Sequence, residues 1–292
     1  MTTLRRTVTI PLQGGLGNQL FQVAAGLVLA DRHGVPVRWS DHWLRHPQPG
    51  DTQRAFALEG LLAPDELTGA AAGVVGTWSD RLTQRVVERS SDDDSLARWR
   101  PRTREVAGYF QRAAYVEQAW PRLHERFRAS PRPQHRRLVS TEPGTHGALH
   151  YRLGDYLDNP AAALRHGIVA PEYFAQELRQ GLAEGIDDWQ IISDDPEGAV
   201  DLLCSQDLPS ELRLTSASTG DEWRDLAVLA SARTCVISNS SFSWWAAWIG
   251  AASHGTKVVA PRPWFADPTA TDPPLFPTTW ERHDRELPQA AH

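Results

Sequence analysis

The second half of the chain alternates short apolar segments with helical segments, and this alternation limits the folds that it can adopt. Apolar runs of strand length occupy residues 148–152, 189–193, 212–215, 235–237 and 257–260. Stretches with helical periodicity lie between them, joined by short connections. Because strands that alternate with helices usually become parallel neighbours, the pattern predicts an α/β fold with a doubly wound parallel sheet.

The first half opens with a strand, a glycine-rich loop and a helix of the same α/β type. The loop carries Gly14, Gly15 and Gly17, and the helix is expected to end at Gly34. Their spacing lacks the last glycine of the dinucleotide-binding fingerprint, and no Lys-Ser or Lys-Thr pair follows as in a P-loop. The loop is therefore either a tight turn or a place where a ligand approaches the backbone closely.

A proline-rich polar stretch at 129–147 is the best candidate for a boundary between the halves. We expect domains at 1–135 and 136–265, followed by an irregular C-terminal tail at 266–292. A helix is expected over 112–128, broken or restarted at Pro121 because proline lacks the amide N–H.

Composition is that of an ordinary globular protein, with 41% hydrophobic and 23% charged residues. The net charge of −6 disfavours a nucleic-acid partner but not a small anionic ligand. We interpret Cys204 and Cys235 as reduced core residues. With no apolar run of membrane-spanning length and no signal peptide expected, we predict a cytoplasmic protein without a transmembrane segment.

Polar residues follow three of the predicted strands at their carboxyl ends. His150, Arg152 and Asp155 follow one strand, the run 193–195 follows another, and the run 238–241 follows a third and precedes an apolar helix. In open parallel sheets ligands bind at this edge, and the helix N-terminus favours an anion. The alternative is that these residues are ordinary turns and helix caps.

An arginine, a hydroxyl-rich helix N-terminus and carboxylates are suited to a nucleoside diphosphate. The arginine can bind phosphate oxygens bidentately, and backbone N–H groups can neutralise the remaining charge. Asp92 and Asp94 spell a metal-binding Asp-x-Asp, but they lie in a solvated loop, so we expect no metal there. The tryptophans after residue 243 are expected to pack in the core.

Six motifs, in this order, resemble those of the α-1,2-fucosyltransferases, glycosyltransferase family 11. They are Gly14 to Gln22, Gly108-Tyr109-Phe110-Gln111, His150-x-Arg152 with Gly154-Asp155-Tyr156, Ser193-Asp194-Asp195, Ser238 to Trp248, and Val259-Ala260-Pro261 with Trp264-Phe265. The motif that begins at Ser238 matches almost residue for residue.

The resemblance implies a GT-B enzyme, with two Rossmann-like halves facing a central cleft. The first would serve the acceptor and the second would bind GDP-L-fucose, with no metal or other cofactor. L-fucose would pass with inversion to the 2-hydroxyl of a terminal β-galactoside on an oligosaccharide or glycolipid. Two alternatives stay open: transfer of another GDP-6-deoxy sugar, and a non-catalytic protein that binds a nucleotide sugar or carbohydrate.

The resemblance also implies roles for individual residues. His150 and Arg152 would meet the pyrophosphate, and Asp194 or Asp195, beside Ser193, would meet guanine or ribose. The remaining donor-binding residues would be Asn239, Ser240, Ser241 and Phe242 in the second half and Gly14, Gly15, Gly17, Asn18 and Gln19 in the first.

One position departs from the family pattern. Leu153 stands where many members carry a second arginine, so the strength of phosphate binding is in question. Arg165 or Arg262 could substitute for it. The acceptor is not evident; lipid-linked O-antigen or capsule intermediates and free oligosaccharides all fit a cytoplasmic enzyme, soluble or peripheral at the inner membrane.

Asp155 is our candidate for the general base, acting with His150 and Arg152, because inversion requires the acceptor hydroxyl to lose its proton as it attacks. The alternative role for Asp155 is to orient His150 or Arg152. If Asp155 is the base, Asp155→Ala loses on the order of 10²-fold or more in kcat. A variant that keeps most of its turnover in a steady-state assay would exclude this assignment.

Overall fold

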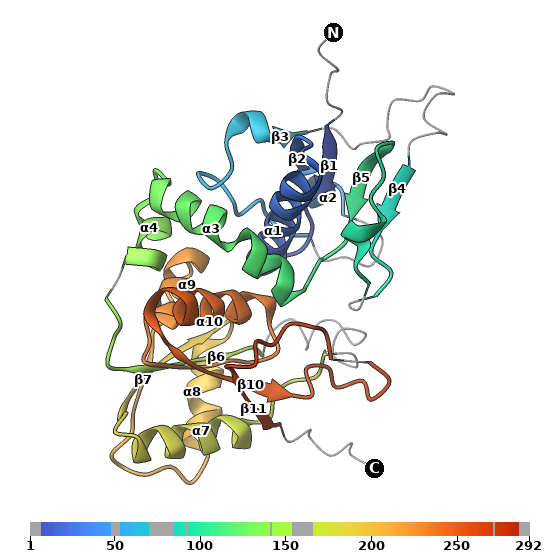
Figure 1. Cartoon of the computed structure of the whole chain (residues 1–292). Helices are drawn as coiled ribbons and strands as arrows, with labels where there is room; N and C mark the ends of the chain where they lie inside the picture. Colours follow the sequence, from blue (N-terminus) through green and yellow to red (C-terminus); the bar gives the residue numbers. More distant parts are fainter. Residues whose placement is uncertain are drawn as a thin grey trace. The chain divides into compact units, whose positions relative to one another are not determined.

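The computed structural model describes residues 7–47, 53–69, 84–90, 93–140, 142–153, 166–270 and 272–285. The chain divides into two compact units (Figure 1). Unit 1 comprises Met1–Arg132 with Pro273–Phe276, and unit 2 comprises Pro133–Asp272 with Pro277–His292. Each unit is described by itself.

Among its described residues, unit 1 contains a parallel sheet of five strands in the order β3-β2-β1-β5-β4. In chain order the elements are β1 (Val8–Pro11), α1 (Leu16–His33), β2 (Val37–Ser40), α2 (His42–Arg45), a 3₁₀ turn (Pro64–Glu66), β3 (Leu67–Thr68), β4 (Gln84–Val87), a second 3₁₀ turn (Ser95–Arg98), β5 (Thr103–Ala107) and α3 (Ala113–Ala129).

Helix α1 forms the centre of unit 1 and packs against α3 and β2. It is buried from Leu16 to Leu29 almost without interruption. Gly26 lets the indole of Trp39 lie against the helix, because a Cβ atom there would come within 2.6 Å of the ring. The helix ends at Gly34 in the left-handed conformation, as its sequence predicts.

Helix α3 continues through Pro121, so the predicted break is wrong. Proline removes the hydrogen bond to the carbonyl group of Glu117, four residues earlier. Pro121 and Glu117 both lie on the exposed side of the helix, so water can satisfy that carbonyl group. The buried residues on the opposite side, among them Leu123 and Phe127, keep α3 packed in unit 1, where its main neighbour is α1.

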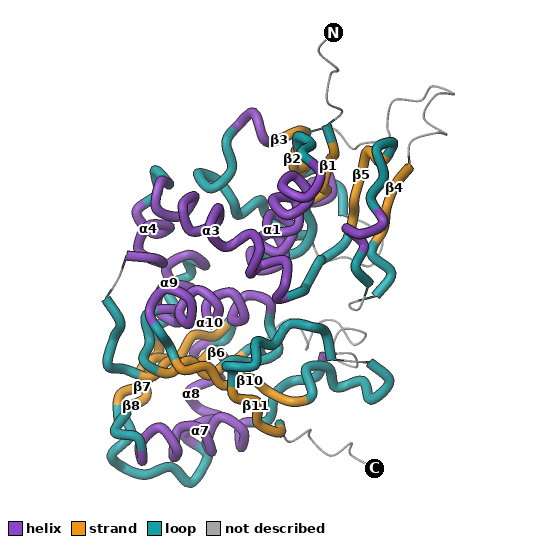
Figure 2. Tube along the Cα trace, viewed as in Figure 1, coloured by secondary structure: helices purple, strands orange, loops and turns teal. Residues whose placement is uncertain are grey.

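The described part of unit 2 contains a parallel sheet of six strands in the order β11-β10-β9-β6-β7-β8. Its elements are α4 (Pro133–Ser140), β6 (Gly147–Tyr151), α7 (Pro171–Ala183), β7 (Asp188–Ser193), α8 (Pro196–Cys204), β8 (Arg213–Ser216), α9 (Glu222–Ala230), β9 (Thr234–Val236), α10 (Ser241–His254), β10 (Lys257–Arg262) and β11 (Glu281–Asp284). Helices α9 and α10 cover one face of the sheet, and α7 and α8 cover the other (Figures 1 and 2).

Trp189 of β7 anchors the α7 side of this sheet and is completely buried. Two glycines make room for its ring. A Cβ atom on Gly181 of α7 would come within 2.3 Å of the indole, and one on Gly147 of β6 would come within 2.5 Å. The indole N–H donates to the carbonyl oxygen of Ile186 at 3.2 Å. The large ring is therefore accommodated by the two glycines and has a partner for its polar atom.

Two sequence predictions about the second half need correction, and the stretch predicted to hold the boundary, inside which the two units divide, contains a helix. The tail is not irregular throughout, because Glu281–Asp284 forms β11 and pairs with β10. The proline-rich stretch proposed as a boundary includes helix α4, in which Pro133 occupies the first position, where a missing N–H costs nothing. Cys235 is buried as predicted, whereas Cys204 is exposed at the end of α8, because its side of the helix faces solvent.

The predicted α/β class with two Rossmann-like halves is confirmed, since each unit has a parallel sheet flanked by helices. That the halves face a cleft stays a prediction. In the ranges described above, no helix is both long enough and apolar enough to cross a membrane.

Candidate functional site

The centre of the site in unit 2 is the junction between the carboxyl ends of β6 and β9. The two strands are paired in parallel, and the N–H of Ser238 continues the pairing by donating to the carbonyl oxygen of His150 at 3.1 Å. The hydroxyl of Ser238 then lies 2.9 Å from Nδ1 of His150. Two residues far apart in the chain are thereby joined at the edge of the sheet where ligands bind in this class of fold.

His150 is neutral in this environment. Its side chain is 4% exposed, and burial, with the neighbouring Arg152 guanidinium, lowers the pKa of His150 to about 3 despite the opposing effect of Asp194. The imidazole also contacts the ring of Phe242, with centroids 5.3 Å apart. His150 can therefore act toward a ligand as a neutral hydrogen-bonding group, and Arg152 carries the positive charge of the motif.

Helix α10 begins at this junction with the cap that its sequence predicts. The hydroxyl of Ser240 accepts a hydrogen bond from the N–H of Phe242 at 3.3 Å, and Ser241 is the first helical residue. The hydroxyl of Ser243 donates to the carbonyl oxygens of Ser238 and Ser240. This turn places the positive end of a helix dipole at the edge of the sheet.

Trp244, Trp245 and Trp248 lie behind this turn and are buried. The rings of Trp244 and Trp248 stack with centroids 5.4 Å apart. The prediction that these tryptophans pack in the core rather than against a sugar is confirmed.

Asn239 has a fixed orientation and one atom without a partner. Its amide nitrogen donates to the carbonyl oxygens of His166 at 2.7 Å and Gly167 at 3.3 Å. Because two carbonyl groups receive the amide N–H groups, the other side-chain atom must be the oxygen. This oxygen is buried and has no hydrogen-bond partner within the part of the chain that the structure describes.

The two aspartates of the Ser-Asp-Asp motif differ in their surroundings. Asp194 is exposed and accepts a hydrogen bond from the N–H of Leu153 at 2.8 Å, which links the ends of β7 and β6. Asp195 is the N-cap of α8 and accepts from the N–H of Gly198 at 3.1 Å. The backbone N–H of Ser193 donates to the hydroxyl of Ser218, and this hydroxyl donates to the carbonyl oxygen of Ser193. No sequence pattern pointed to Ser218. Asp194 is thus better placed than Asp195 to recognise a ligand.

Leu153, which replaces the second arginine of the family motif, points away from His150 and Arg152. Its side chain belongs to the same hydrophobic cluster as Leu149 and Tyr151. Alternate residues along a strand face opposite sides of a sheet, so His150 and Arg152 lie on the other side. An arginine at position 153 would therefore lie on the side of the sheet covered by α7 and α8, and not next to Arg152.

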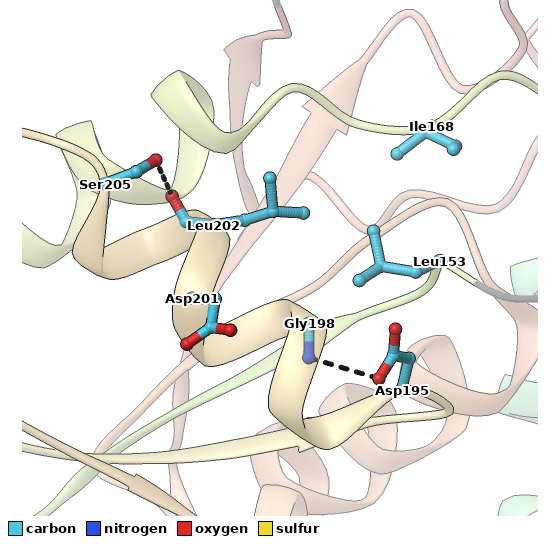
Figure 3. A pocket seen from close by; sticks show the side chains of 7 residues that line it. All are labelled: Leu153, Ile168, Asp195, Gly198, Asp201, Leu202 and Ser205. Atoms are coloured by element: carbon cyan, nitrogen blue, oxygen red, sulfur yellow. Dashed lines mark hydrogen bonds between the residues drawn. The ribbon is translucent and has the colours of Figure 1, made fainter.

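Leu153 lines a cavity of about 450 Å³ beside α8 (Figure 3). Ile168 and Leu202 supply further apolar side chains, and Asp195 and Asp201 are also among the lining residues, although the lining is almost entirely apolar. Apolar walls with nearby carboxylates suit a flat ring that bears N–H groups on its edge.

Of three further residues named from the sequence, the structure describes only Arg262. Asp155 and Arg165 lie outside the described residues. Arg262 is exposed and forms an ion pair with Asp284, with 2.9 Å between Nε and Oδ1. Arg262 therefore pairs with Asp284 on the outer strands of the sheet, where water solvates its charge.

In unit 1 the predicted donor-binding loop is held by buried amide side chains. Gln19 is completely buried and bonds to the backbone of Gly14, Ala55 and Ala57 at 2.8 to 3.0 Å. Its amide groups are therefore occupied by the scaffold. Gly14 has a φ angle of +75°, and a Cβ atom there would come within 2.4 Å of the Asn18 amide. Glycine is thus required at this position.

Gly15 and Gly17 differ from Gly14. Gly15 has an extended backbone and open space around its Cα atom, so its lack of a side chain leaves the start of α1 accessible. Gly17 is buried within the first turn of α1. Gly15 is therefore the loop glycine best suited to a close approach by a ligand.

The Gly-Tyr-Phe-Gln motif of unit 1 joins this loop. Gln111 donates to the side-chain oxygen of Asn18 at 2.8 Å. The Glu88 carboxylate accepts from the N–H groups of Tyr109 and Phe110 at 2.7 and 2.9 Å and supports the left-handed backbone of Phe110, with φ of 55°. Burial raises the pKa of Glu88. No sequence pattern identified Glu88, because it is distant in the chain from the motif that it holds.

The structure thus brings His150, Arg152, Asp194 and the turn at 238–242 together at one edge of the sheet in unit 2. It assigns capping or scaffold roles to Asp195 and Gln19. Within the described ranges, no three His, Cys, Asp or Glu side chains are arranged to hold a metal ion.

The state of His150 can be tested by NMR. Its folded pKa of about 3 lies below the value of about 6.5 for an unfolded histidine. Below pH 6.5 the unfolded chain binds a proton at His150, whereas the folded chain binds it only near pH 3. The free energy of unfolding therefore decreases as the pH falls from about 6.5 to about 3.

We expect the ring resonances of His150, assigned by their loss in His150→Gln, to keep the shifts of a neutral imidazole from pH 8 to pH 5. A midpoint near the ordinary value of about 6.5 would contradict the neutral assignment.

Comparison with known proteins identifies the family of the chain. The family model described as Glycosyl transferase family 11 matches residues 106–282, more than half of the chain. Two curated proteins from Escherichia coli are similar. An O-antigen biosynthesis glycosyltransferase, WbnK, is 31% identical over 41% of this chain and 39% of its own length. An alpha-1,2-colitosyltransferase is 28% identical over 47% of each chain. The alignments thus span less than half of either relative.

Solved structures with a similar fold include POFUT1 in complex with GDP-fucose and the fucosyltransferase NodZ from Bradyrhizobium. The first is 12% identical with a TM-score of 0.45, covering 89% of this chain and 99% of that chain. The second is 13% identical with a TM-score of 0.47, covering 85% and 94%. Because both TM-scores lie below 0.5, the assignment rests on the family match alone. The extent of that match, across β6, β7 and the turn before α10, shows that the chain belongs to glycosyl transferase family 11.

Proposed function

We propose that this protein transfers L-fucose from GDP-L-fucose to the 2-hydroxyl of a terminal β-galactoside, with inversion and without a metal ion. The observation that carries the proposal is the cluster of Arg152, neutral His150, Asp194 and the start of α10 at one edge of a parallel sheet. In a glycosyltransferase, such a cluster suits a sugar nucleotide because the diphosphate needs compensation on several sides.

The diphosphate would be bound by groups of different kinds. Arg152 supplies a guanidinium group on the same side of β6 as His150. His150 supplies one N–H from a neutral ring, and the first turn of α10 supplies backbone N–H groups. As the sugar leaves, negative charge grows on the diphosphate, and these preorganised donors would stabilise it.

The chemical step would be a single displacement at the anomeric carbon. The acceptor oxygen attacks from the side opposite the diphosphate, the bond to the diphosphate oxygen breaks, and the acceptor proton passes to a base. Asp155 remains our prediction for that base.

The base of the nucleotide would occupy the cavity beside α8. Its apolar residues Leu153, Ile168 and Leu202 can contact the faces of a purine. The Asp201 carboxylate, and the Asp195 oxygen that does not cap α8, would be the acceptors for the N–H groups of guanine. Asp194, next to the cavity residue Asp195, would then lie near the ribose.

A second candidate is transfer of another 6-deoxy or related sugar from a GDP donor. The similarity to a protein named alpha-1,2-colitosyltransferase favours keeping this alternative. The similarity to an O-antigen biosynthesis glycosyltransferase supports an acceptor among O-antigen intermediates. In both cases the nucleotide would bind in the same way, and the sugar and the acceptor would differ.

Release of GDP is the first test. In excess EDTA, we expect GDP-L-fucose to give more GDP when galactose-terminated acceptors such as lactose and N-acetyllactosamine are added. Arg152→Ala serves as the control for contaminating activity. It should reduce kcat/KM about tenfold to a hundredfold, the loss typical of charged hydrogen bonds.

A panel of GDP-linked sugars decides between the candidates. Faster turnover with GDP-colitose than with GDP-L-fucose would favour the second candidate. Absence of turnover, together with absence of GDP binding by calorimetry, would contradict both. GDP binding without turnover of any donor would favour the non-catalytic alternative.

The nucleotide pocket is tested by Leu202→Trp. Leu202 is 39% exposed, so the larger ring can be accommodated without disturbing the core, but it would fill part of the cavity. We expect GDP affinity to fall about tenfold, which corresponds to about 1.4 kcal/mol. Val87→Trp, at a residue of unit 1 that is 45% exposed, controls for adding a surface tryptophan. Unchanged GDP affinity in folded Leu202→Trp would place the base elsewhere.

A further inference from the structure

Arg285 is a buried arginine that follows the last strand of unit 2. It is 4% exposed, and its N–H continues the pairing of β11 with β10 by donating to the carbonyl oxygen of Arg262 at 3.0 Å. It lies beyond residue 282, where the family match ends. Arginine is rarely buried unless its guanidinium has a role in holding other groups.

The guanidinium of Arg285 reaches the segment that holds Asn239. Its Nη2 atom donates to the carbonyl oxygen of His166 at 2.8 Å. The side-chain amide of Asn239 donates to the same oxygen at 2.7 Å and to the carbonyl oxygen of Gly167 at 3.3 Å. Arg285 and Asn239 are therefore connected through a single carbonyl group.

The segment between them, at His166 and Gly167, is closely packed. Gly167 has a φ angle of +63°, and a Cβ atom there would come within 2.6 Å of the Ala266 methyl group and 3.3 Å of Nη2 of Arg285. The rings of His166 and Phe265 are in edge-to-face contact, with centroids 5.3 Å apart. Because the packing is close, displacement of the guanidinium would be transmitted to the His166 carbonyl group.

Asn239 lies between the two serines that build the diphosphate side of the site. Ser238 binds His150, and Ser240 caps α10. A change in the position of the Asn239 side chain would therefore shift both the imidazole contact and the helix start. A charge-assisted hydrogen bond such as that of Arg285 is stronger than a neutral one and is suited to fixing this geometry.

We propose that Arg285 is a positioning residue for donor binding, acting through the His166 carbonyl group on Asn239 and the turn at 238–240. The inference rests on the proposed function and extends it to a residue outside the matched motifs. Arg285 thereby links the outermost strand of the sheet to the diphosphate side of the site.

The test measures GDP affinity by calorimetry and KM for GDP-L-fucose, with thermal unfolding of every variant. Arg285→Gln should weaken GDP binding and raise KM about tenfold, as expected for loss of a charged hydrogen bond. Arg285→Lys keeps the charge and one donor and should lose about threefold.

Arg282→Gln is the matched control. Arg282 lies in β11, three residues before Arg285, and binds the Pro261 carbonyl oxygen and Asp272 at 2.7 and 2.8 Å, contacts that do not involve His166. It should lower thermal stability while leaving GDP affinity within about twofold, because its contacts are structural.

A double-mutant cycle with Asn239→Ala separates positioning from general stability. If Arg285 acts through Asn239, then Arg285→Gln should change GDP affinity less than about twofold in the Asn239→Ala background. If the double variant loses GDP affinity by the product of the two single-variant factors, the inference is overturned. A folded Arg285→Gln variant with the GDP affinity of the wild type would also overturn it. If Arg285→Gln does not fold, Arg285→Lys in both backgrounds decides in the same way. Failure of the wild-type protein to bind GDP would instead contradict the proposed function itself.

Discussion

The parallel pairing of β6 with β9 is the interaction on which the site in unit 2 depends. It places His150 beside Ser238, whose hydroxyl binds the imidazole in a buried position. The same pairing sets the direction of α10, because Ser240 caps that helix two residues later. Desolvation at this junction keeps His150 neutral, so the positive charge needed for an anion must come from Arg152 and the helix N-terminus.

Several motif residues fix the backbone or side chains of their own unit. Asp195 caps a helix, Gln19 binds three backbone groups, and Gln111 holds Asn18. Such side chains fix loops whose backbone and remaining side chains are then available to a ligand. Arg285, a buried arginine outside the motifs, has a comparable role in unit 2 through its hydrogen bond to the His166 carbonyl group.

Sequence patterns predicted the regular parts of the fold well and the exceptions poorly. The strand–turn–helix unit at 235–254 and the glycine-rich start of α1 were predicted because caps, glycines and apolar periodicity are local signals. Pro121 was misjudged, since tolerance of a proline depends on whether the affected carbonyl group faces water. Strand β11 was missed because an edge strand of mixed polarity carries no periodic signal and forms only against β10.

The sequence by itself determined the α/β class, the family motifs and the position of the polar residues at the ends of strands, because these follow from local pattern and spacing. Only the tertiary structure decided which of those residues are available for chemistry. It assigned Asp195 to a helix cap, turned Leu153 away from Arg152, lowered the pKa of His150 and connected Arg285 to Asn239. Burial and hydrogen-bond partners are set by segments distant in the chain, and these contacts exist only when the sheet has formed.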